Sequence, residues 1–412
     1  MNNFIIEPER KIDVLSSCDV LVAGGGIAGI AAAMAAARNG KKVTLVEREY
    51  GLGGMATLGL ITIYLPLCDG EGNQVVFGIA EELLKLSIAH GAEAGLYPDA
   101  WLNGGSLDSR LKSRYVTQYN PHLFALRAEA LLVKLGVTIL YGTTICAVKK
   151  DADMISHVIV ENKSGRTAIA VASVIDGTGD ADICHMAGAK TALYAKGNGL
   201  ASWYYYIQSG EVKLKMFGLA DIVPGRAPEG EHAAAGKEYK NEKVESLDQN
   251  VRFSGVDGDQ LSRAVIAAHE KMFNDIETHH KADQSYLPTT ISSIPLVRMS
   301  RRLVGAYTMD DTEIKTHMKD SIGMTGDWRK KGPVYEIPFG TLYGYEVKNL
   351  LAAGRDISVT DNMWDITRVI PPCAVTGEAA GIAAAMGNDF TVTNISELQE
   401  RLVAAGVRLH WD

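Results

Sequence analysis

Cysteine is scarce in this sequence and shows none of the spacings that carry chemistry. The 412 residues contain only Cys18, Cys68, Cys146, Cys184 and Cys373, with no CxxC or CxxxxC pair. An odd, widely spaced set indicates neither a disulfide framework nor a zinc site. A dithiol enzyme that exchanges disulfides is disfavoured as well. We therefore expect a reducing, cytoplasmic location and no bound metal.

The sequence also predicts neither a membrane span nor a secretion signal. No basic N-terminal region is followed by an apolar run and a cleavage site of small residues. Residues 20–37 carry no polar side chain, but Gly24, Gly25, Gly26 and Gly29 lie within them. A helix loses about 1 kcal/mol at each interior glycine. This stretch therefore predicts a strand, a turn and a helix and not a membrane span.

Neither sign of charge dominates the composition. The chain has 41 basic and 49 acidic residues, a formal net charge of −8, which disfavours a mainly electrostatic nucleic-acid binder. Hydrophobic residues make up 47% and charged residues 22%, as in globular proteins. This length predicts two or three structural units, on a prior of about 100–200 residues each. Glycine is in excess, with 42 of 412 residues.

Part of that excess forms a dinucleotide-binding motif. An apolar strand (19–23), the turn GGGIAG and an Ala-rich helix precede a second strand that ends at Glu47. Gly24, Gly26 and Gly29 satisfy G-x-G-x-x-G, in which glycines permit the tight turn and let the backbone approach a pyrophosphate at the helix N-terminus. Glu47 follows at the distance expected of an acid that binds ribose hydroxyls. An acid here favours FAD or NAD over NADP.

A second motif near the C-terminus favours FAD over NAD. Residues 350–353 predict a buried strand that delivers Gly354 and Asp356 to the mouth of a parallel sheet, where Asp356 could bind the ribityl chain. Thr376 is predicted to open another Ala-rich helix, whose dipole would stabilise negative charge on a reduced flavin. The alternative is that Thr376 is an ordinary N-cap and Gly381 serves packing. No second strand followed by GxGxxG is present, which disfavours a built-in NAD(P)H domain.

Together with GLGGMAT, VIDGTGDADI, RMSRRLVGAY and NLLAAGRDIS…TRVIPPCAVTGEAAGIAAA, these motifs give a family resemblance. Over nearly its whole length the chain resembles FAD-dependent oxidoreductases of the glutathione-reductase-like superfamily, most closely a bacterial group described only by that activity. The resemblance implies FAD as cofactor and an α/β fold. It implies a discontinuous Rossmann-like FAD-binding domain (1–195 and 348–412) with an inserted mixed α+β substrate or cap domain (196–347).

The resemblance also implies cofactor contacts from both ends of the chain. The loop at Gly53 would approach the phosphates and the flavin, the backbone of Val148 would meet the adenine, and Asp180 would end the strand that closes the FAD domain. Residues expected to bind FAD are Gly24, Gly26, Ile27, Ala28, Gly29, Glu47, Arg48, Gly53, Gly54, Met55, Ala56, Val148, Gly177, Gly179, Gly354, Arg355, Asp356, Arg368, Val369, Pro371, Gly377 and Ala380.

The inserted segment is predicted to combine strands with one long helix. Residues 201–208 are aromatic and strand-like, 260–279 are helical in pattern and 291–308 return to β. Residues 221–258, rich in Gly, Pro and charge, predict an exposed excursion.

Six residues are candidates for the catalytic or substrate site. Arg298 and Arg301 could clamp a carboxylate or an FAD phosphate, with ordinary salt bridges as the alternative. Tyr204 shares a strand face with Tyr206 and could serve the site or sheet packing. The remaining candidates are Asp327, Arg329 and Trp364, which lie in segments predicted to be loops.

The expected function is hydride transfer between flavin N5 and a small polar organic substrate, with an external electron acceptor or donor. One alternative is a reductase or dehydrogenase acting on the C=C bond of a carboxylate. Another is a flavin-binding electron-relay subunit of a larger assembly. The sequence predicts no nucleic-acid partner and leaves homo-oligomerisation open.

Overall fold

The computed structural model describes residues 5, 7–217 and 251–411, so most of the predicted excursion at 221–258 lies outside the described residues. The core is a seven-stranded sheet in the order β5-β2-β1-β8-β7-β6, with β16 also paired to β8. The strands are β5 Thr138–Leu140, β2 Val43–Val46, β1 Val14–Ala23, β8 Gly165–Asp176, β7 Met154–Asn162, β6 Thr144–Asp151 and β16 Leu350–Ala352. Strands β5, β2, β1, β8 and β16 are parallel, whereas β7 and β6 form an antiparallel extension.

Strand β8 joins the two ends of the chain. One of its edges pairs with β1, and its last residues, 174–176, pair in parallel with β16 near the C-terminus. Because β1 and β16 both belong to this sheet, its parallel part is built from distant segments. The predicted α/β fold with a Rossmann-like sheet is confirmed.

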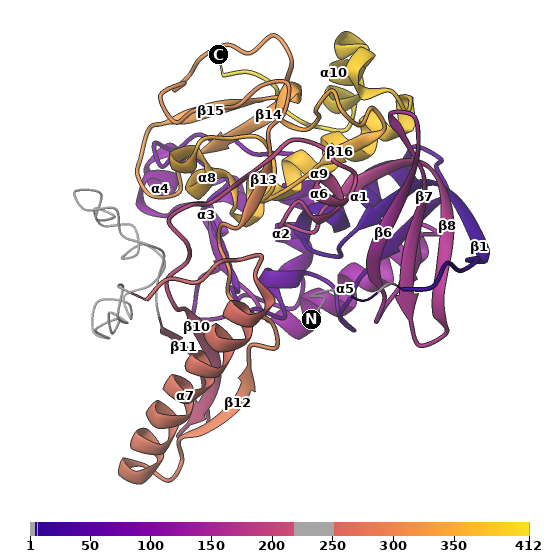
Figure 1. The fold of residues 1–412 in the computed structure, drawn as a ribbon. Coiled ribbons are helices and arrows are strands. Elements are labelled where there is room, and N and C mark those ends of the chain that lie inside the picture. Colours follow the sequence, from indigo (N-terminus) through magenta and orange to yellow (C-terminus); the bar gives the residue numbers. More distant parts are fainter. Residues whose placement is uncertain (1–4, 6, 218–250, 412) are drawn as a thin grey trace.

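Helices α1 (Ile27–Arg38) and α9 (Ile370–Met386) pack against each other beside this sheet (Figure 1). Small residues allow the close approach. A Cβ added at Gly377 would lie 2.2 Å from the Ala28 carbonyl oxygen, and one at Gly381 would lie 2.4 Å from that of Ala32. The same core includes residues of α2 (Ile79–Ser87), α5 (Pro121–Lys134) and α10 (Ile395–Ala404). The backbones of α1 and α9 therefore pack directly against each other.

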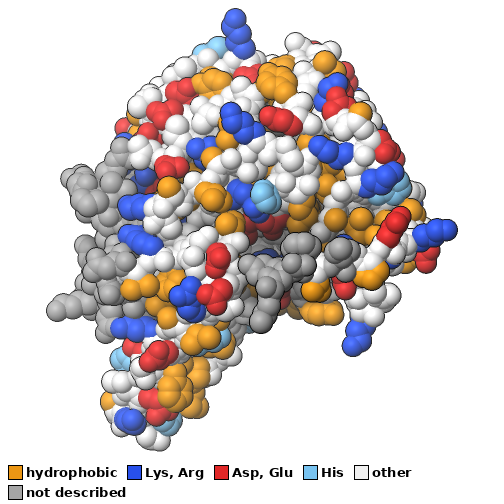
Figure 2. Space-filling model, viewed as in Figure 1, with side chains coloured by type: hydrophobic (Ala, Val, Ile, Leu, Met, Phe, Trp, Pro, Cys, Tyr) orange, Lys and Arg blue, Asp and Glu red, His pale blue; other side chains and the backbone are white. Residues whose placement is uncertain are grey.

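An arm extends from the body of the molecule (Figure 1). It consists of the antiparallel sheet β11-β10-β12 and the long helix α7, with β10 Ser202–Gln208, β11 Glu211–Phe217, β12 Leu287–Ile291 and α7 Gly258–Ala282. Only Ala268 and Met272 of α7 are buried. Apolar side chains are visible on the surface of the arm (Figure 2), whose exposed residues include Ile266, Phe273 and Leu287.

Shorter elements complete the fold. Hairpin β14–β15 (Ser321–Gly326 and Val334–Pro338) shares the core of α1 and α9, although it lies in the range predicted for the inserted domain. The domain boundaries at 195 and 347 stay a prediction. The other elements are β3 Ile63–Tyr64, β4 Thr117–Gln118, β9 Thr191–Leu193, β13 Arg301–Leu303, α3 Asp99–Leu102, α4 Leu107–Lys112, α6 Asp182–Met186, α8 Asp361–Thr367 and the 3₁₀ turns Gly54–Ala56, Phe339–Thr341 and Phe390–Val392.

Two predicted helix features near the C-terminus are wrong. Helix α9 begins at Ile370 and not at Thr376, because prolines fit the first turn of a helix, where no amide donor is needed. Thr376 is therefore not an N-cap, and its hydroxyl accepts a hydrogen bond from the Gly354 amide at 3.0 Å. Residues 361–365, predicted to be a loop, begin α8, which Thr360 caps.

Three predicted strands also differ. The strand predicted at 137–148 is divided into β5 and β6, with Gly142 in a left-handed conformation (φ +54°) between them. Strand β8 ends at Asp176, four residues before Asp180. Within 291–308 only β13 forms a new strand, and Pro295 lacks the amide that a sheet needs.

In the described part of the chain, no single helix is both long and apolar enough to cross a membrane. Helices α8 and α9 meet the length and composition criteria only as a pair bent by 89°. All five cysteines are free, and four of them are buried.

Candidate functional site

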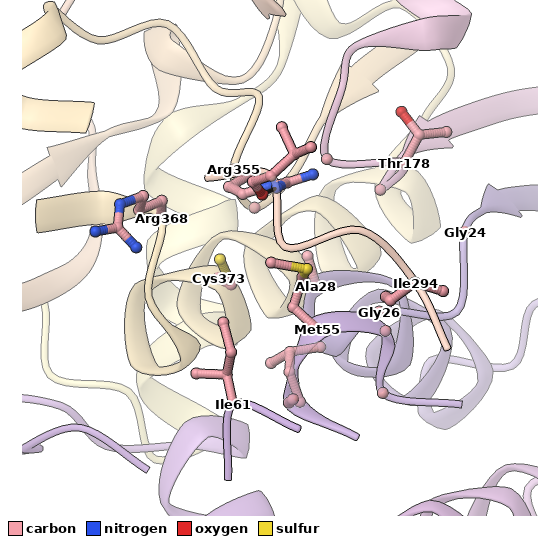
Figure 3. Close-up of a pocket in the computed structure, with 18 of the residues that line it drawn as sticks. Gly24, Gly26, Ala28, Met55, Ile61, Thr178, Ile294, Arg355, Arg368 and Cys373 are labelled. Carbon is pink, nitrogen blue, oxygen red and sulfur yellow. Dashed lines mark hydrogen bonds between the residues drawn. The ribbon is translucent and has the colours of Figure 1, made fainter. Parts of the chain in front are cut away.

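A cavity of about 510 Å³ lies between the sheet, the N-termini of α1 and α9, and the base of the arm. Its lining comes from both ends of the chain and from the inserted segment. Figure 3 shows Gly24 and Gly26 toward one side of it and Arg368 toward the other, with Ala28, Met55 and Cys373 between them. The cavity is therefore elongated from the glycine turn toward a region that contains arginine.

The glycine turn forms one end of the cavity. Gly24 has φ +92°, and a Cβ there would lie 2.7 Å from the Gly177 carbonyl oxygen. Gly26 is the N-cap residue of α1, and a Cβ there would meet no protein atom within 4 Å, because it would enter the cavity. No side chain among the described residues caps this helix. The unpaired amides and the helix dipole make this end suited to an anion.

Glu47 is held beside this turn. Its carboxylate Oε2 accepts a hydrogen bond from the Gly25 amide at 2.7 Å, and Oε1 accepts one from the Glu49 amide at 2.9 Å. Burial raises the pKa of Glu47 despite these two bonds. The residue lines the cavity at the end of β2, where it can accept hydrogen bonds from ribose hydroxyls.

The loop after β2 folds back onto the glycine turn. The Gly53 amide donates to the Gly25 carbonyl at 2.8 Å, and Gly53 has φ +101°. Gly54, Met55 and Ala56 follow in a 3₁₀ turn that lines the cavity. The glycine turn and the loop after β2 thus both expose backbone groups to the cavity.

An acidic loop after β8 forms another wall. Asp180 accepts hydrogen bonds from Ser300 and, at 3.0 Å, from Arg355. Asp182 forms an ion pair with Arg301 at 2.6 Å. Burial, together with the nearby charge of Asp180, raises the pKa of Asp182 to about 6. Arg301 therefore neutralises this loop and does not line the cavity itself.

Besides Arg48 and Arg355, four arginines line the cavity: Arg114, Arg298, Arg329 and Arg368. Two aspartates bind two of them, Arg329 and Arg368, and the charge of Arg298 also acts on one of these aspartates, Asp365. Arg329 binds Asp327 through Nε and Nη2, at 2.9 and 3.0 Å, and reaches Asp365 at 3.3 Å. Arg368 also donates to Asp365, with Nε at 3.0 Å.

Trp328 connects this cluster to Arg114. Its indole Nε1 donates to the Asp365 carbonyl at 2.9 Å, and its own carbonyl accepts from Arg114 at 3.4 Å. Burial opposes the ionisation of Asp365, but the surrounding guanidinium groups, Arg368 first, lower its pKa. The arrangement is a fixed, charged network and not a set of flexible surface side chains.

A sequence model for the description "FAD dependent oxidoreductase" matches residues 19–402. The chain belongs to this family. Its cofactor is FAD, and it is an FAD-dependent oxidoreductase. A search of curated proteins gives no match.

Solved structures similar to this oxidoreductase have low identity. One is a geranylgeranyl bacteriochlorophyll reductase-like protein from Thermoplasma acidophilum, 14% identical with a TM-score of 0.47, covering 95% of this chain and 84% of the other. Another is p-nitrophenol 4-monooxygenase from Pseudomonas putida, 12% identical with a TM-score of 0.44, covering 90% of this chain and 79% of the other. Both TM-scores lie below 0.5, so neither structure indicates a substrate for this chain.

The residues of the cavity fit FAD. The space that a Cβ at Gly26 would fill lies at an uncapped helix N-terminus, as a pyrophosphate requires. Glu47 offers a carboxylate beside it. Trp203, from the arm, lines the cavity with a buried indole Nε1 that lacks a partner among the described residues, and so presents a donor to a ligand.

The structure brings most of the predicted FAD residues to the cavity. Those that line it are Gly24, Gly26, Ile27, Ala28, Glu47, Arg48, Gly53, Gly54, Met55, Ala56, Gly177, Gly179, Gly354, Arg355, Arg368 and Val369. Those outside the lining are Gly29, Val148, Asp356, Pro371, Gly377 and Ala380. Residues 143–145, next to Val148, line it instead. Asp356 is fully buried, with Oδ2 bonded to the Ala181 amide at 3.2 Å, and burial raises its pKa. The predicted ribityl contact stays a prediction.

The six catalytic candidates divide in the same way. Arg298 and Arg329 line the cavity, whereas Arg301, Asp327, Tyr204 and Trp364 do not. Sequence reasoning missed Arg114 as a site residue. No motif surrounds Arg114, and only the fold brings it to Trp328.

Proposed function

We propose that this oxidoreductase transfers a hydride between FAD and a small organic substrate that carries a carboxylate. The observation behind this proposal is the network of arginines that line the cavity, of which Arg368 lies at the end away from the glycine turn (Figure 3). Bound FAD supplies the hydride donor or acceptor at its N5. The protein then has to bind the substrate, orient it and exclude water.

Charge supports an anionic substrate. Four arginines line this region, and Asp327 and Asp365 fix two of them, Arg329 and Arg368, in place. Guanidinium groups bind carboxylates in bidentate geometry, and such bonds are stronger where water is excluded. A carboxylate bound here would fix one end of the substrate.

An apolar wall supports a compact substrate body. Ile61, Leu65, Ile294 and Val297 line the cavity together with Cys373. Burial raises the pKa of Cys373 to about 12, so its thiol is neutral at physiological pH and is not an activated nucleophile. Cys373 therefore acts as part of the wall that excludes water around the reacting carbon.

The arginine network favours the alternative in which the enzyme reduces or forms a C=C bond in a carboxylate substrate. A carboxylate adjacent to a C=C bond, or to the C–C bond from which it forms, would use both the arginine network and the apolar wall. Reduction and dehydrogenation of such a bond are the two directions of one reaction. An external carrier would supply or remove the electrons, and homo-oligomerisation stays a prediction.

The test is to mix reduced enzyme anaerobically with unsaturated acids and with their methyl esters, and to follow flavin absorbance. The same acids in saturated form are offered to oxidised enzyme. We expect reaction with an acid in at least one direction and none with its ester. Equal rates for acid and ester, or reaction with a neutral alcohol or sugar only, would overturn the proposal. So would a lack of reaction with every acid in both directions.

A variant pair ties this result to the arginine network. Arg298→Met should raise the KM for the acid at least about tenfold while FAD content is retained, because a buried charge-assisted bond is lost. The matched control is Arg263→Met on α7, where the arginine is exposed and pairs with Asp259 at 2.9 Å. It should leave KM unchanged.

A further inference from the structure

A cluster of three side chains that could ligate a metal ion lies outside the cavity. His317 precedes β14, Glu336 lies in β15, and His410 belongs to the C-terminal segment. One potential ligand atom from each residue lies within 4.8 Å of the others. None of the three lines the FAD cavity.

The separations are close to those of a metal site. His410 Nδ1 is 2.8 Å from Glu336 Oε2, and His317 Nδ1 is 3.8 Å from the same oxygen. Two ligands of a tetrahedral zinc ion are about 3.3 Å apart, given metal–ligand bonds of about 2.0–2.1 Å. One observed distance is shorter and the other longer than this value, and all three ligand atoms lie within 4.8 Å of one another, so side-chain rotations could place them around one ion.

Glu336 is held in place before any ion binds. Its side chain is only 2% exposed, Oε2 accepts from the Met318 amide at 2.8 Å, and Oε1 accepts from the Trp411 amide at 3.0 Å. Bonds of this kind to a ligating carboxylate are the outer partners that orient metal ligands. The centroids of the two imidazole rings lie 4.4 Å apart, and the Nδ1 atom of each ring lies within 3.8 Å of this carboxylate.

One ligand provides access from solvent. The side chain of His317 is 68% exposed and that of His410 is 31% exposed, so an ion could enter and keep a water molecule as its fourth ligand. Two cationic side chains close to this segment in sequence, Lys315 and Arg408, lie over the Trp411 ring. Neither side chain therefore occupies the space between the three proposed ligands.

We propose that His317, Glu336 and His410 form a binding site for a divalent transition-metal ion, with Zn²⁺ as its representative. Two imidazoles and one carboxylate suit Zn²⁺ and neighbouring transition metals, whereas Mg²⁺ and Ca²⁺ prefer oxygen ligands. Binding would replace the hydrogen bond between His410 and Glu336 and fasten the C-terminal segment to hairpin β14–β15. The role is structural, since the ion would not reach the cavity. Spacing along the sequence conceals the site, because Glu336 and His410 are 74 residues apart.

The test uses the full chain with FAD bound, after removal of metals with a chelator. Zn²⁺ is titrated by calorimetry, metal content is measured by mass spectrometry, and Co²⁺ is added as a spectroscopic probe of coordination. We expect one tight site per chain, a higher melting temperature with Zn²⁺, a four-coordinate Co²⁺ spectrum, and no effect of Mg²⁺. Absence of a stoichiometric site would overturn the proposal.

Single variants locate the site. His317→Ala and His410→Ala should each weaken Zn²⁺ binding about tenfold or more, because each removes one of three protein ligands. His317 is exposed, so its variant should fold normally even if His410→Ala does not. His269→Ala, an exposed position on α7, is the control and should bind Zn²⁺ as the original chain does. Unchanged affinity in His317→Ala would place the metal elsewhere and contradict the assignment.

Discussion

The Glu47 carboxylate accepts a hydrogen bond from the Gly25 amide, with 2.7 Å between Oε2 and N. This bond joins the end of β2 to the turn that begins α1, so an acid expected to bind ribose also holds the glycine turn in shape. Its second oxygen is bonded to the Glu49 amide at 2.9 Å. A side chain with two acceptor oxygens is therefore needed at position 47 to accept hydrogen bonds from both backbone amides.

Glu47→Gln should therefore weaken FAD binding. The amide group keeps one acceptor but turns a donor toward the other backbone amide, and a lost charge-assisted bond costs about 1.5–3 kcal/mol. We expect an increase in the dissociation constant of FAD of about tenfold or more, measured by flavin fluorescence. Glu270→Gln, on the exposed surface of α7, is the control. Equal affinity in the two variants would show that Glu47 does not contact or shape the FAD site.

Substitution by alanine should weaken FAD binding at Gly26 and lower the stability of the fold at Gly29. Gly26 has φ −67°, which alanine also adopts, and its Cβ would enter the cavity. Gly26→Ala should cost about 1 kcal/mol or less in apoprotein stability but weaken FAD binding about tenfold or more. A Cβ at Gly29 would lie 1.9 Å from the Gly24 carbonyl oxygen. Gly29→Ala should therefore lower stability by about 1–3 kcal/mol or more.

Thermal unfolding of the apoproteins and flavin titration separate the two effects. The interpretation would be contradicted by a Gly26→Ala variant that binds FAD normally, or by a Gly29→Ala variant of unchanged stability. This pair distinguishes a glycine required by the ligand from one required by the fold.

The glycine turn could be predicted from sequence because its determinants are local. Strand, turn, helix and Glu47 follow one another within about 30 residues, and their order fixes their geometry. The C-terminal strand β16 could be predicted for the same reason, since its glycine and acid follow it directly. The start of α9 was missed because Thr376 resembles an N-cap, while Pro371 marks the actual first turn.

The arginine network could not be predicted, because it depends on long-range packing. Arg298 and Arg301 are three residues apart, yet one lines the cavity and the other pairs with Asp182. Arg114 meets Trp328 only because segments distant in sequence pack together. No spacing rule connects such positions, and the same holds for the cluster around Glu336.

A buried carboxylate on α9 should make stability depend on pH. Glu378 is 2% exposed, and its Oε2 accepts from the Ile79 amide at 2.8 Å. Burial raises its pKa from 4.5 to about 7, with the Ile79 bond and Arg38 opposing the shift. The folded state thus binds a proton that the unfolded state loses. Stability from this group is fully present below about pH 4.5 and is lost as pH rises through about 7.

Glu378→Gln should remove the loss of folding stability that accompanies a rise in pH. Glutamine keeps an acceptor for the Ile79 amide but carries no charge, so at about pH 8 the variant should gain about 3 kcal/mol relative to the original chain. At about pH 5 the two should be similar. Urea unfolding at both pH values measures the difference, and Glu397→Gln, an exposed residue paired with Arg401, is the control. A difference that does not change with pH would contradict the assignment to Glu378.

Tyr204 should prove structural despite its place among the catalytic candidates. Its hydroxyl is hydrogen-bonded to Asp275 and Tyr286 on the face of β10 that packs against α7, and burial raises its pKa. Tyr204→Phe should destabilise the chain by about 1–2 kcal/mol in urea unfolding, because Asp275 loses a donor. FAD content, kcat and KM should be unchanged. Trp203→Phe, on the opposite face and in the cavity lining, is the matched variant and should change KM or FAD affinity. A large fall in kcat for Tyr204→Phe, with FAD still bound, would return this residue to the catalytic site.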